Sequence, residues 1–304
     1  MTHPQLSAIL SSAAAIDLSS HLRLRFSGSD RLRYLNGQLT NDVAKASPNH
    51  ALPAAVTNLK GRLEGIVHLH SSHDAIFLDA PASLRDSLPP RLEKYIIADD
   101  VTVDDLSDAS SLIHVAGRSP DQLSQLLSES EHSLSHPRFG IPGSDIWSTP
   151  DRLDFWLSQF PPLSPSDAAD LMVLHAIPDW DRDLSDGILP PEARLESTHI
   201  DYHKGCYIGQ EVISRMRTAG KTNRLLVPVR IPDSIPDAIP SQGWQLFLPD
   251  SPDSPVGTLS STATHPDGGA IALAWLRRDA GPGPWQCLPP APLSAPPCLA
   301  SRIG

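Results

Sequence analysis

The distribution of proline most constrains how this chain can fold, because proline is excluded from central strands of a sheet and from helix interiors. The 304 residues include 31 prolines, and 15 of these lie between residues 228 and 304. Short apolar runs such as LLVPVRI and IALAWL separate them. We therefore expect short strands and rigid loops in the C-terminal part, as a small β-barrel or sandwich that begins near residue 225.

The preceding part contains segments typical of both strands and helices. Alternating or continuous apolar runs predict strands at residues 21–27, 54–59, 62–70, 75–80, 101–106, 111–117 and 152–159. The runs between 54 and 80 are expected to form an antiparallel meander. Helices are expected after Asp30 as N-cap through Leu35, on both sides of Pro89-Pro90, over DQLSQLLSES, and over AADLMVLHAI with Ser166 or Asp167 as cap.

These elements do not follow the regular period of βαβ units, so the expected class is α+β with antiparallel sheets. The expected domains are an α+β region over residues 1–225, with subdomains at about 1–110 and 111–225, and a β-barrel domain over 226–304.

Charge, cysteine content and hydropathy exclude several classes of protein. The formal net charge is -11, which repels phosphate backbones and argues against nucleic-acid binding. No run approaches the roughly 18 apolar residues of a membrane helix, so no membrane association is expected. The three cysteines form no C-x-x-C pair, which fits a reducing compartment. No Lys or Arg precedes Arg23, unlike a secretory signal, so the expected location is the cytoplasm.

One segment, KGCYIGQEVISRMRTAGKTNR at residues 204–224, has a net charge of +4 inside this acidic chain. A helix is expected from about Gly209 to Thr218, ended by Gly220. Cys206 therefore comes just before a helix N-terminus and two residues after Lys204, and both positive charges favour a thiolate. The alternatives are that Cys206 is a buried small apolar residue and that the basic run is a solvated face.

K-G-C-Y-I-G-Q-E, followed by Arg215, resembles the signature of the YgfZ-type folate-binding proteins, which belong to the superfamily of the glycine-cleavage T-protein (aminomethyltransferase). GSDRLRYLNGQLTNDV at 28–43, LPPEARLE at 189–196 and the Lys60-Gly61-Arg62 turn are also similar to motifs of that superfamily. Together the resemblance spans residues 16–230.

The resemblance implies a tetrahydrofolate-binding α+β core arranged as a ring around a central opening, with a C-terminal β-barrel. It implies a role in assembling or repairing iron–sulfur proteins, in tRNA modification, and partners among iron–sulfur proteins or cluster-assembly factors. Cys206 is then the reactive thiol and Lys204 its electrostatic activator. The candidate folate-binding residues are Asn41, Asp42, Arg62, Glu192, Tyr207, Gln210, Glu211 and Arg215.

Two of these candidates have local alternatives. Asp42 could pair with the guanidine-like edge of a pterin or belong to an Asx turn with Asn41. Glu192 could contact the ligand or be an acid in the first turn of a helix. Gln210 and Glu211 are expected to orient the loop through hydrogen bonds, and Arg215 to capture a carboxylate.

Two other functions remain open: a folate-dependent aminomethyl or one-carbon transferase, and a non-enzymatic interaction module. Against the transferase, Gly65 and Ile66 stand where the transferases have two aspartates, and Glu64 is one residue early. Met172 and Ala176 stand where relatives tend to have Arg and Gly, which affects the expected ligand affinity. The thirteen histidines form no H-x-x-x-H pattern, so no metal site is expected.

Overall fold

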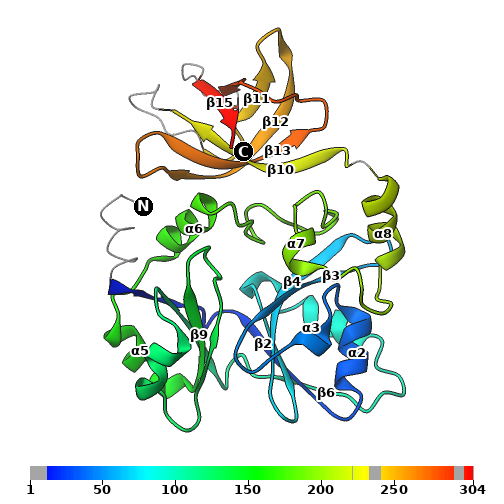
Figure 1. Cartoon of the computed structure of the whole chain (residues 1–304), viewed down its shortest axis with the longest axis vertical. Coiled ribbons are helices and arrows are strands. Elements are labelled where there is room, and N and C mark those ends of the chain that lie inside the picture. The colour runs from blue at the N-terminus through cyan, green and yellow to red at the C-terminus, as the bar shows by residue number, and fades with distance from the viewer. Residues whose placement is uncertain (1–11, 221, 233–240, 291–297, 304) are drawn as a thin grey trace.

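The computed structural model describes residues 12–220, 222–232, 241–290 and 298–303. It contains a five-stranded sheet, a four-stranded sheet and a closed six-stranded barrel. Figure 1 shows the two open sheets side by side, with the barrel above them. This arrangement confirms the expected α+β class with antiparallel sheets and a C-terminal barrel.

The five-stranded sheet has the order β3-β4-β5-β2-β6, all antiparallel. Its strands are β2 (Leu22–Ser27), β3 (Leu52–Thr57), β4 (Leu63–Ser71), β5 (Ile76–Ala80) and β6 (Thr102–Asp105). β3, β4 and β5 form the meander that the alternation predicts. This sheet supplies most of the largest apolar core, which Leu226 and Leu273 of the barrel also join.

The four-stranded sheet has the order β1-β7-β9-β8. Its strands are β1 (Ala14–Asp17), β7 (Ser111–Ala116), β8 (His132–Ser135) and β9 (Gly143–Ser148). β1 comes from the N-terminal end of the described chain and pairs with β7. A separate apolar core around Ile113, Val115 and Trp156 covers one of its faces.

The barrel has the order β10-β13-β12-β11-β14-β15. Its strands are β10 (Arg224–Ile231), β11 (Gln245–Leu248), β12 (Ser251–Thr264), β13 (Ala270–Arg277), β14 (Trp285–Leu288) and β15 (Cys298–Arg302). β12 has 14 residues, so the expectation of short strands throughout was wrong. Pro255 lies where the register with β11 shifts, and an irregularity of this kind accommodates a residue that cannot donate to the ladder.

The described helices are short, and two of them begin at proline. They are α2 (Arg31–Gln38), α3 (Leu88–Glu93), α4 (Pro120–Leu123), α5 (Leu153–Gln159), α6 (Pro165–Leu174), α7 (Glu196–His199) and α8 (Gln210–Ala219). Within the described ranges, 3-10 turns lie at Val43–Lys45, Ala82–Leu84, Ser124–Leu126 and Pro150–Arg152. None of the helices in the described ranges has the length and apolar character that crossing a bilayer requires.

The strand predicted at 152–159 was wrong, because these residues form α5. A 3-10 turn with Pro150 in its first turn leads into this helix, and Asp154 lies in the first helical turn, where acids are favoured. The buried Trp156 donates from its indole nitrogen to Glu131, 2.7 Å away. Strict alternation would have placed Trp156 on the face opposite to Leu153 and Phe155, but all three pack into one apolar cluster.

Several helix boundaries also differ from expectation. Pro89 and Pro90 lie inside the first turn of α3, where a missing N–H is harmless, so they do not separate two helices. DQLSQLLSES contributes only three residues to α4, which begins at Pro120, and then a 3-10 turn. The cap of α6 is Ser164, whose hydroxyl accepts from the Asp167 amide. α2 runs three residues beyond Leu35, and the Asp30 side chain accepts from the Asp100 amide instead of capping it.

Candidate functional site

The K-G-C-Y segment is fastened to the end of α2 through Lys204. The Lys204 ammonium donates to three backbone carbonyls, those of Asn36 at 2.8 Å, Leu39 at 2.6 Å and Asn41 at 2.6 Å. Carbonyls at a helix C-terminus lack partners within the helix, and a cation there is favoured by the helix dipole. Burial lowers the pKa of Lys204 to about 8. The two motifs at 28–43 and 204–211 therefore meet in space.

Cys206 is exposed and lies in the loop that leads into α8. Gly209, the N-cap of α8, has φ 87°, a left-handed conformation that glycine adopts readily. A Cβ on Gly209 would lie 2.9 Å from the Gly61 Cα, so the Lys60-Gly61-Arg62 turn packs directly against the start of α8. Figure 1 shows α8 at the right of the molecule, beyond β3 and β4.

Asn41 is buried and all of its side-chain bonds are to backbone. Its amide nitrogen donates to the carbonyls of Pro53, at 2.8 Å, and Thr198, at 3.2 Å, and its side-chain oxygen accepts from the Asp42 amide. The Asp42 carboxylate accepts from the Ala44 amide, at 3.1 Å, as in an Asx turn. The structure thus gives both residues a local structural role, and their contact with folate stays a prediction.

Glu192 and Arg62 also have partners within the chain. The Glu192 carboxylate accepts from the Leu189 amide at 3.3 Å and lies 3.5 Å from Nε of Arg224. The exposed Arg62 donates to the carbonyl of Gly187. The next residue, Ala193, lines the first of two cavities described below, but Glu192 itself does not.

The remaining predicted residues lie at or near the first turn of α8. Tyr207 is buried, its hydroxyl has no hydrogen-bond partner among the described residues, and burial raises its pKa to about 12. Gln210 is the first residue of α8 and is half-buried. Glu211 and Arg215 are exposed and pair with each other at 2.5 Å, one helical turn apart. Lys221 of the basic run lies outside the described residues.

Two adjoining cavities lie where the two sheets and the barrel meet. The first has a volume of about 540 Å³ and is lined from the barrel by Leu226, Pro228 and Leu273. The second has a volume of about 380 Å³ and is lined by Ile66, Trp180 and the end of β1. Six residues line both cavities: His68, Arg138, Ile177, Pro178, Leu195 and His199. None of the ten predicted site residues lines either cavity.

The linings of the two cavities differ in charge. Among the described residues, the first is lined by two arginines, four histidines and no carboxylate. The second is lined by three aspartates, Asp17, Asp179 and Asp181. Burial raises the pKa of Asp179. An elongated ligand that occupies both cavities would therefore meet hydrogen-bond acceptors at one end and a cation at the other.

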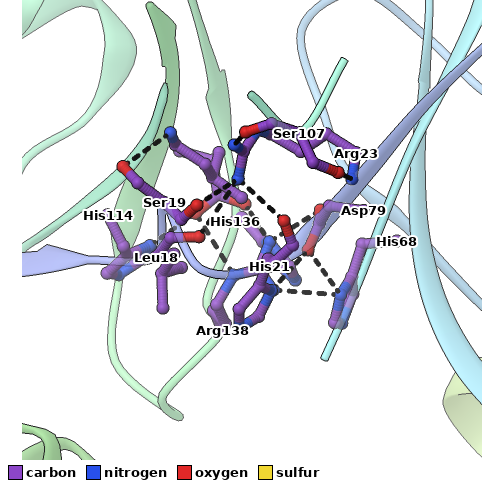
Figure 2. A network of polar contacts seen from close by, with 12 residues as sticks. Leu18, Ser19, His21, Arg23, His68, Asp79, Ser107, His114, His136 and Arg138 are labelled. Atoms are coloured by element: carbon purple, nitrogen blue, oxygen red, sulfur yellow. Dashed lines mark hydrogen bonds and ion pairs between the residues drawn. The ribbon is translucent and has the colours of Figure 1, made fainter. Parts of the chain in front are cut away.

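Arg138 is the centre of a buried polar network between the sheets, shown in Figure 2. Its guanidinium donates to Asp79 of β5 at 2.9 Å and to Asp145 of β9 at 2.6 Å. Burial alone would raise the pKa of each carboxyl, but the charge of Arg138 and the neighbouring histidines together outweigh it and hold both pKa values well below their usual range. His114 and His136 donate to Asp145, at 2.7 and 2.6 Å. One arginine therefore joins the two sheets.

The histidines around the cavities are held neutral. Arg138 donates to Nδ1 of His68 at 3.1 Å, which requires that nitrogen to be unprotonated. Burial, together with the charge of Arg138, lowers the pKa of His68 to about 3. Burial likewise lowers the pKa of His199 to about 3 and that of His70 to about 3. His70 stacks on Phe77 and shares a hydrogen bond with His132, 2.7 Å away.

The β4 position of the transferase aspartates carries no carboxylate here. A Cβ on Gly65 would contact Leu84 and Leu88, so Gly65 faces apolar packing. Ile66 lines the second cavity. Glu64 is held by Arg91, with Oε2 to Nε at 2.5 Å, and lines neither cavity.

The cavity-lining residues Arg138, Arg194 and His199 were missed by the sequence analysis. Arg194 lies inside the LPPEARLE motif. A single basic residue among apolar and acidic neighbours could have marked it as a candidate binding residue. Arg138 and His199 belong to no recognisable pattern, because their partners are far away in sequence. Ala176 has φ 56° and lines the first cavity, while Met172 lines the second.

The exposure of the three cysteines leads to a first testable prediction. Native protein is expected to react with one equivalent of a thiol reagent such as iodoacetamide, at Cys206, because Cys287 and Cys298 are buried. After unfolding, three equivalents are expected. Peptide mass spectrometry locates the label, and Cys206→Ser should abolish rapid labelling of the native protein. Rapid native labelling of Cys287 or Cys298 would contradict the described barrel.

This chain is similar in sequence and in fold to known proteins. No protein-family model matches the chain. A tRNA-modifying protein YgfZ of Photobacterium profundum is 26% identical over 294 residues, which cover 88% of this chain and 84% of that protein. An iron-sulfur cluster assembly factor IBA57 homolog, mitochondrial, of Mycosarcoma maydis is 26% identical over 304 residues, which cover 86% of this chain and 72% of that protein.

The fold itself matches a solved structure. The glycine cleavage system aminomethyltransferase T of Bartonella henselae superposes with a TM-score of 0.83 at 14% sequence identity, over 96% of this chain and 85% of that one. This likeness shows the same fold, including the C-terminal barrel. The chain is thus similar in sequence, at 26–28% identity over two thirds or more of its length, to YgfZ proteins, and it has the fold of the glycine-cleavage aminomethyltransferase.

Proposed function

We propose that this protein binds tetrahydrofolate in its central cavities and supports the assembly or repair of iron–sulfur proteins, with Cys206 as the reactive thiol. The observation that carries the proposal is the pair of adjoining cavities between two sheets and a barrel, in the fold of an aminomethyltransferase. The names of the similar proteins, which refer to tRNA modification and iron-sulfur cluster assembly, support the second half. Three free cysteines support a reducing compartment, which we propose is the cytoplasm.

The residues of the cavities fit a folate. Each volume falls within the range of roughly 300–1,000 Å³ that small-molecule sites occupy. Ile66, Ile177 and Leu195 offer apolar walls to a ring system, while Asp179 and Asp181 offer acceptors to the N–H edge of a pterin. Tetrahydrofolate supplies a carrier for one-carbon units when bound. The protein's own part is to enclose the ring and to exclude water from it.

Cys206 can serve an iron–sulfur cargo only together with other ligands. Clusters are generally held by four protein ligands, most often cysteine thiolates. The two other cysteines of this chain are buried in the barrel, and no group of three His, Cys, Asp or Glu in the described part of the chain could hold a metal ion. We therefore propose that the cluster is a cargo shared with a client or assembly protein. Lys204 positions the Cys206 loop, and its action on the thiol stays a prediction.

Titration with tetrahydrofolate tests the first half of the proposal. Isothermal titration calorimetry under anaerobic conditions is expected to show saturable micromolar binding by the wild type. Ile177→Asp places a charge in the apolar wall that the two cavities share and should weaken that binding strongly, whereas Leu59→Asp, at a surface residue exposed by 76%, should not. An intact fold by circular dichroism with no binding would contradict the proposal.

Complementation tests the second half. In a strain that lacks such a factor, Cys206→Ser is expected to lose the activity of iron–sulfur enzymes while the purified variant still binds tetrahydrofolate. Cys287→Ser is the matched control, because it removes a thiol that is buried in the barrel. Full complementation by Cys206→Ser would exclude a required thiol and would leave a non-enzymatic interaction module as the better interpretation.

A further inference from the structure

We propose that Arg194 is a carboxylate-binding residue at the first cavity, where it captures the glutamate end of a folate. The inference rests on the proposed function and names a contact that lies outside the basic K-G-C-Y segment. Three observations support it: the backbone conformation of Arg194, its lack of an ion-pair partner, and the charge of the cavity that it lines.

Arg194 is held in an unfavourable conformation by a tightly bonded turn. Its φ is 59°, in the left-handed region that residues with a Cβ seldom adopt. The turn is fixed by hydrogen bonds from the Arg194 amide to Pro191, at 3.3 Å, and from the Leu195 amide to Pro190, at 3.1 Å. Ala193 and Leu195 on either side are buried, while Arg194 is exposed and lines the first cavity. Backbone strain of this kind clusters at ligand-binding positions.

The Arg194 guanidinium has no hydrogen bond or ion pair with the described residues. Its neighbouring acids are engaged elsewhere: Glu192 with Arg224 and the Leu189 amide, and Glu196 with the hydroxyl of Tyr202 at 3.1 Å. The other arginine of the cavity, Arg138, is neutralised by Asp79 and Asp145. Arg194 is therefore the uncompensated cation among the described residues that line this cavity.

The lining of the first cavity also favours an anion. It contains no described carboxylate, although the whole chain has a net charge of -11. Arginine binds carboxylates through two parallel hydrogen bonds, and such charge-assisted bonds are stronger than neutral ones. Because the aspartates line the second cavity, a pterin conjugate would place its N–H edge there and its carboxylates at Arg194.

Binding of three ligands to Arg194→Asn tests the inference. Asparagine tolerates the left-handed backbone, so the variant removes the charge without adding strain. The ligands are folinate, its triglutamate form, and tetrahydrobiopterin, which has a pterin ring but no glutamate. Arg278→Asn is the matched control, because Arg278 is an exposed arginine on the barrel that lines neither of the two cavities.

We expect Arg194→Asn to weaken binding of both folates by roughly tenfold, the effect of losing a hydrogen bond to a charged group. Binding of tetrahydrobiopterin should be unchanged, and the salt dependence of folate binding should decrease. Arg278→Asn should match the wild type. Equal folate binding by Arg194→Asn and the wild type would overturn this inference but not the proposed function. Equal weakening of the binding of all three ligands would do the same. Absence of folate binding by the wild type would overturn the proposed function and the inference with it.

Discussion

Replacement of Arg138 by methionine is expected to lower the free energy of unfolding by about 3–5 kcal/mol, the usual effect of removing one partner of a buried ion pair. The Asp79 and Asp145 carboxylates are 3% and 1% exposed, and both depend on this guanidinium. Without it, each would remain charged in a poorly solvated place or take up a proton. Because Asp79 belongs to β5 and Asp145 to β9, the variant also loses the polar link between the two sheets.

Urea denaturation followed by circular dichroism measures this effect. Arg25→Met is the matched control: Arg25 also faces two aspartates, Asp74 at 3.4 Å and Asp104 at 3.8 Å, but on the surface. Exposed pairs contribute about 0–1 kcal/mol, so the control should unfold close to the wild type. If both variants lost the same stability, burial of the network would not be what makes Arg138 important.

Acidification is expected to destabilise the protein steadily below about pH 6.5. The pKa of His68 is about 3 in the folded protein, and near 6.5 in an unfolded chain. Between these values the unfolded state binds more protons, so the stabilisation is complete above about pH 6.5 and is lost as the pH falls toward 3. His70 and His199, with pKa values of about 3, act in the same direction. Asp79 and Asp145 add to the loss below about pH 4.

The slope of stability against pH is the quantity to measure. Each such histidine contributes at most about 1.4 kcal/mol per pH unit. His68→Gln removes one titrating group but keeps an oxygen that can accept from Arg138, so its slope should be smaller than that of the wild type by up to this amount. His73→Gln, at an exposed turn residue, is the control and should leave the slope unchanged. A wild-type stability that is flat from pH 7 to pH 5 would contradict neutral, buried histidines.

Much of the fold could be predicted because its signals are local. Alternation identifies β2 and the β3-β4-β5 meander, and Gly209 and Gly220 mark the two ends of α8. The barrel follows from strand-like runs between prolines, although β14 and β15 were not foreseen. α5 was misassigned because a seven-residue apolar segment does not distinguish a helix from a strand by periodicity alone.

The candidate site was less predictable because it is assembled from distant segments. His68 bonds to Arg138 across 70 residues, and His70 to His132 across 62. Both are contacts between the two sheets, which no local sequence pattern indicates. The motif residues Asn41 and Glu192 lie next to residues that line the first cavity but do not line it themselves. The described lining comes from residues such as Arg194 and His199.

Asn41 has a consequence that extends beyond its own hydrogen bonds. It holds Pro53 and Thr198 in the wall of the first cavity, and its carbonyl receives Lys204, two residues before Cys206. A ligand that shifts this wall therefore acts on the same residue that anchors the cysteine loop. For the function proposed above, thermodynamic linkage then requires reciprocity: the factor by which folate in the cavity changes the affinity of Cys206 for a cluster cargo equals the factor by which that cargo changes the affinity for folate.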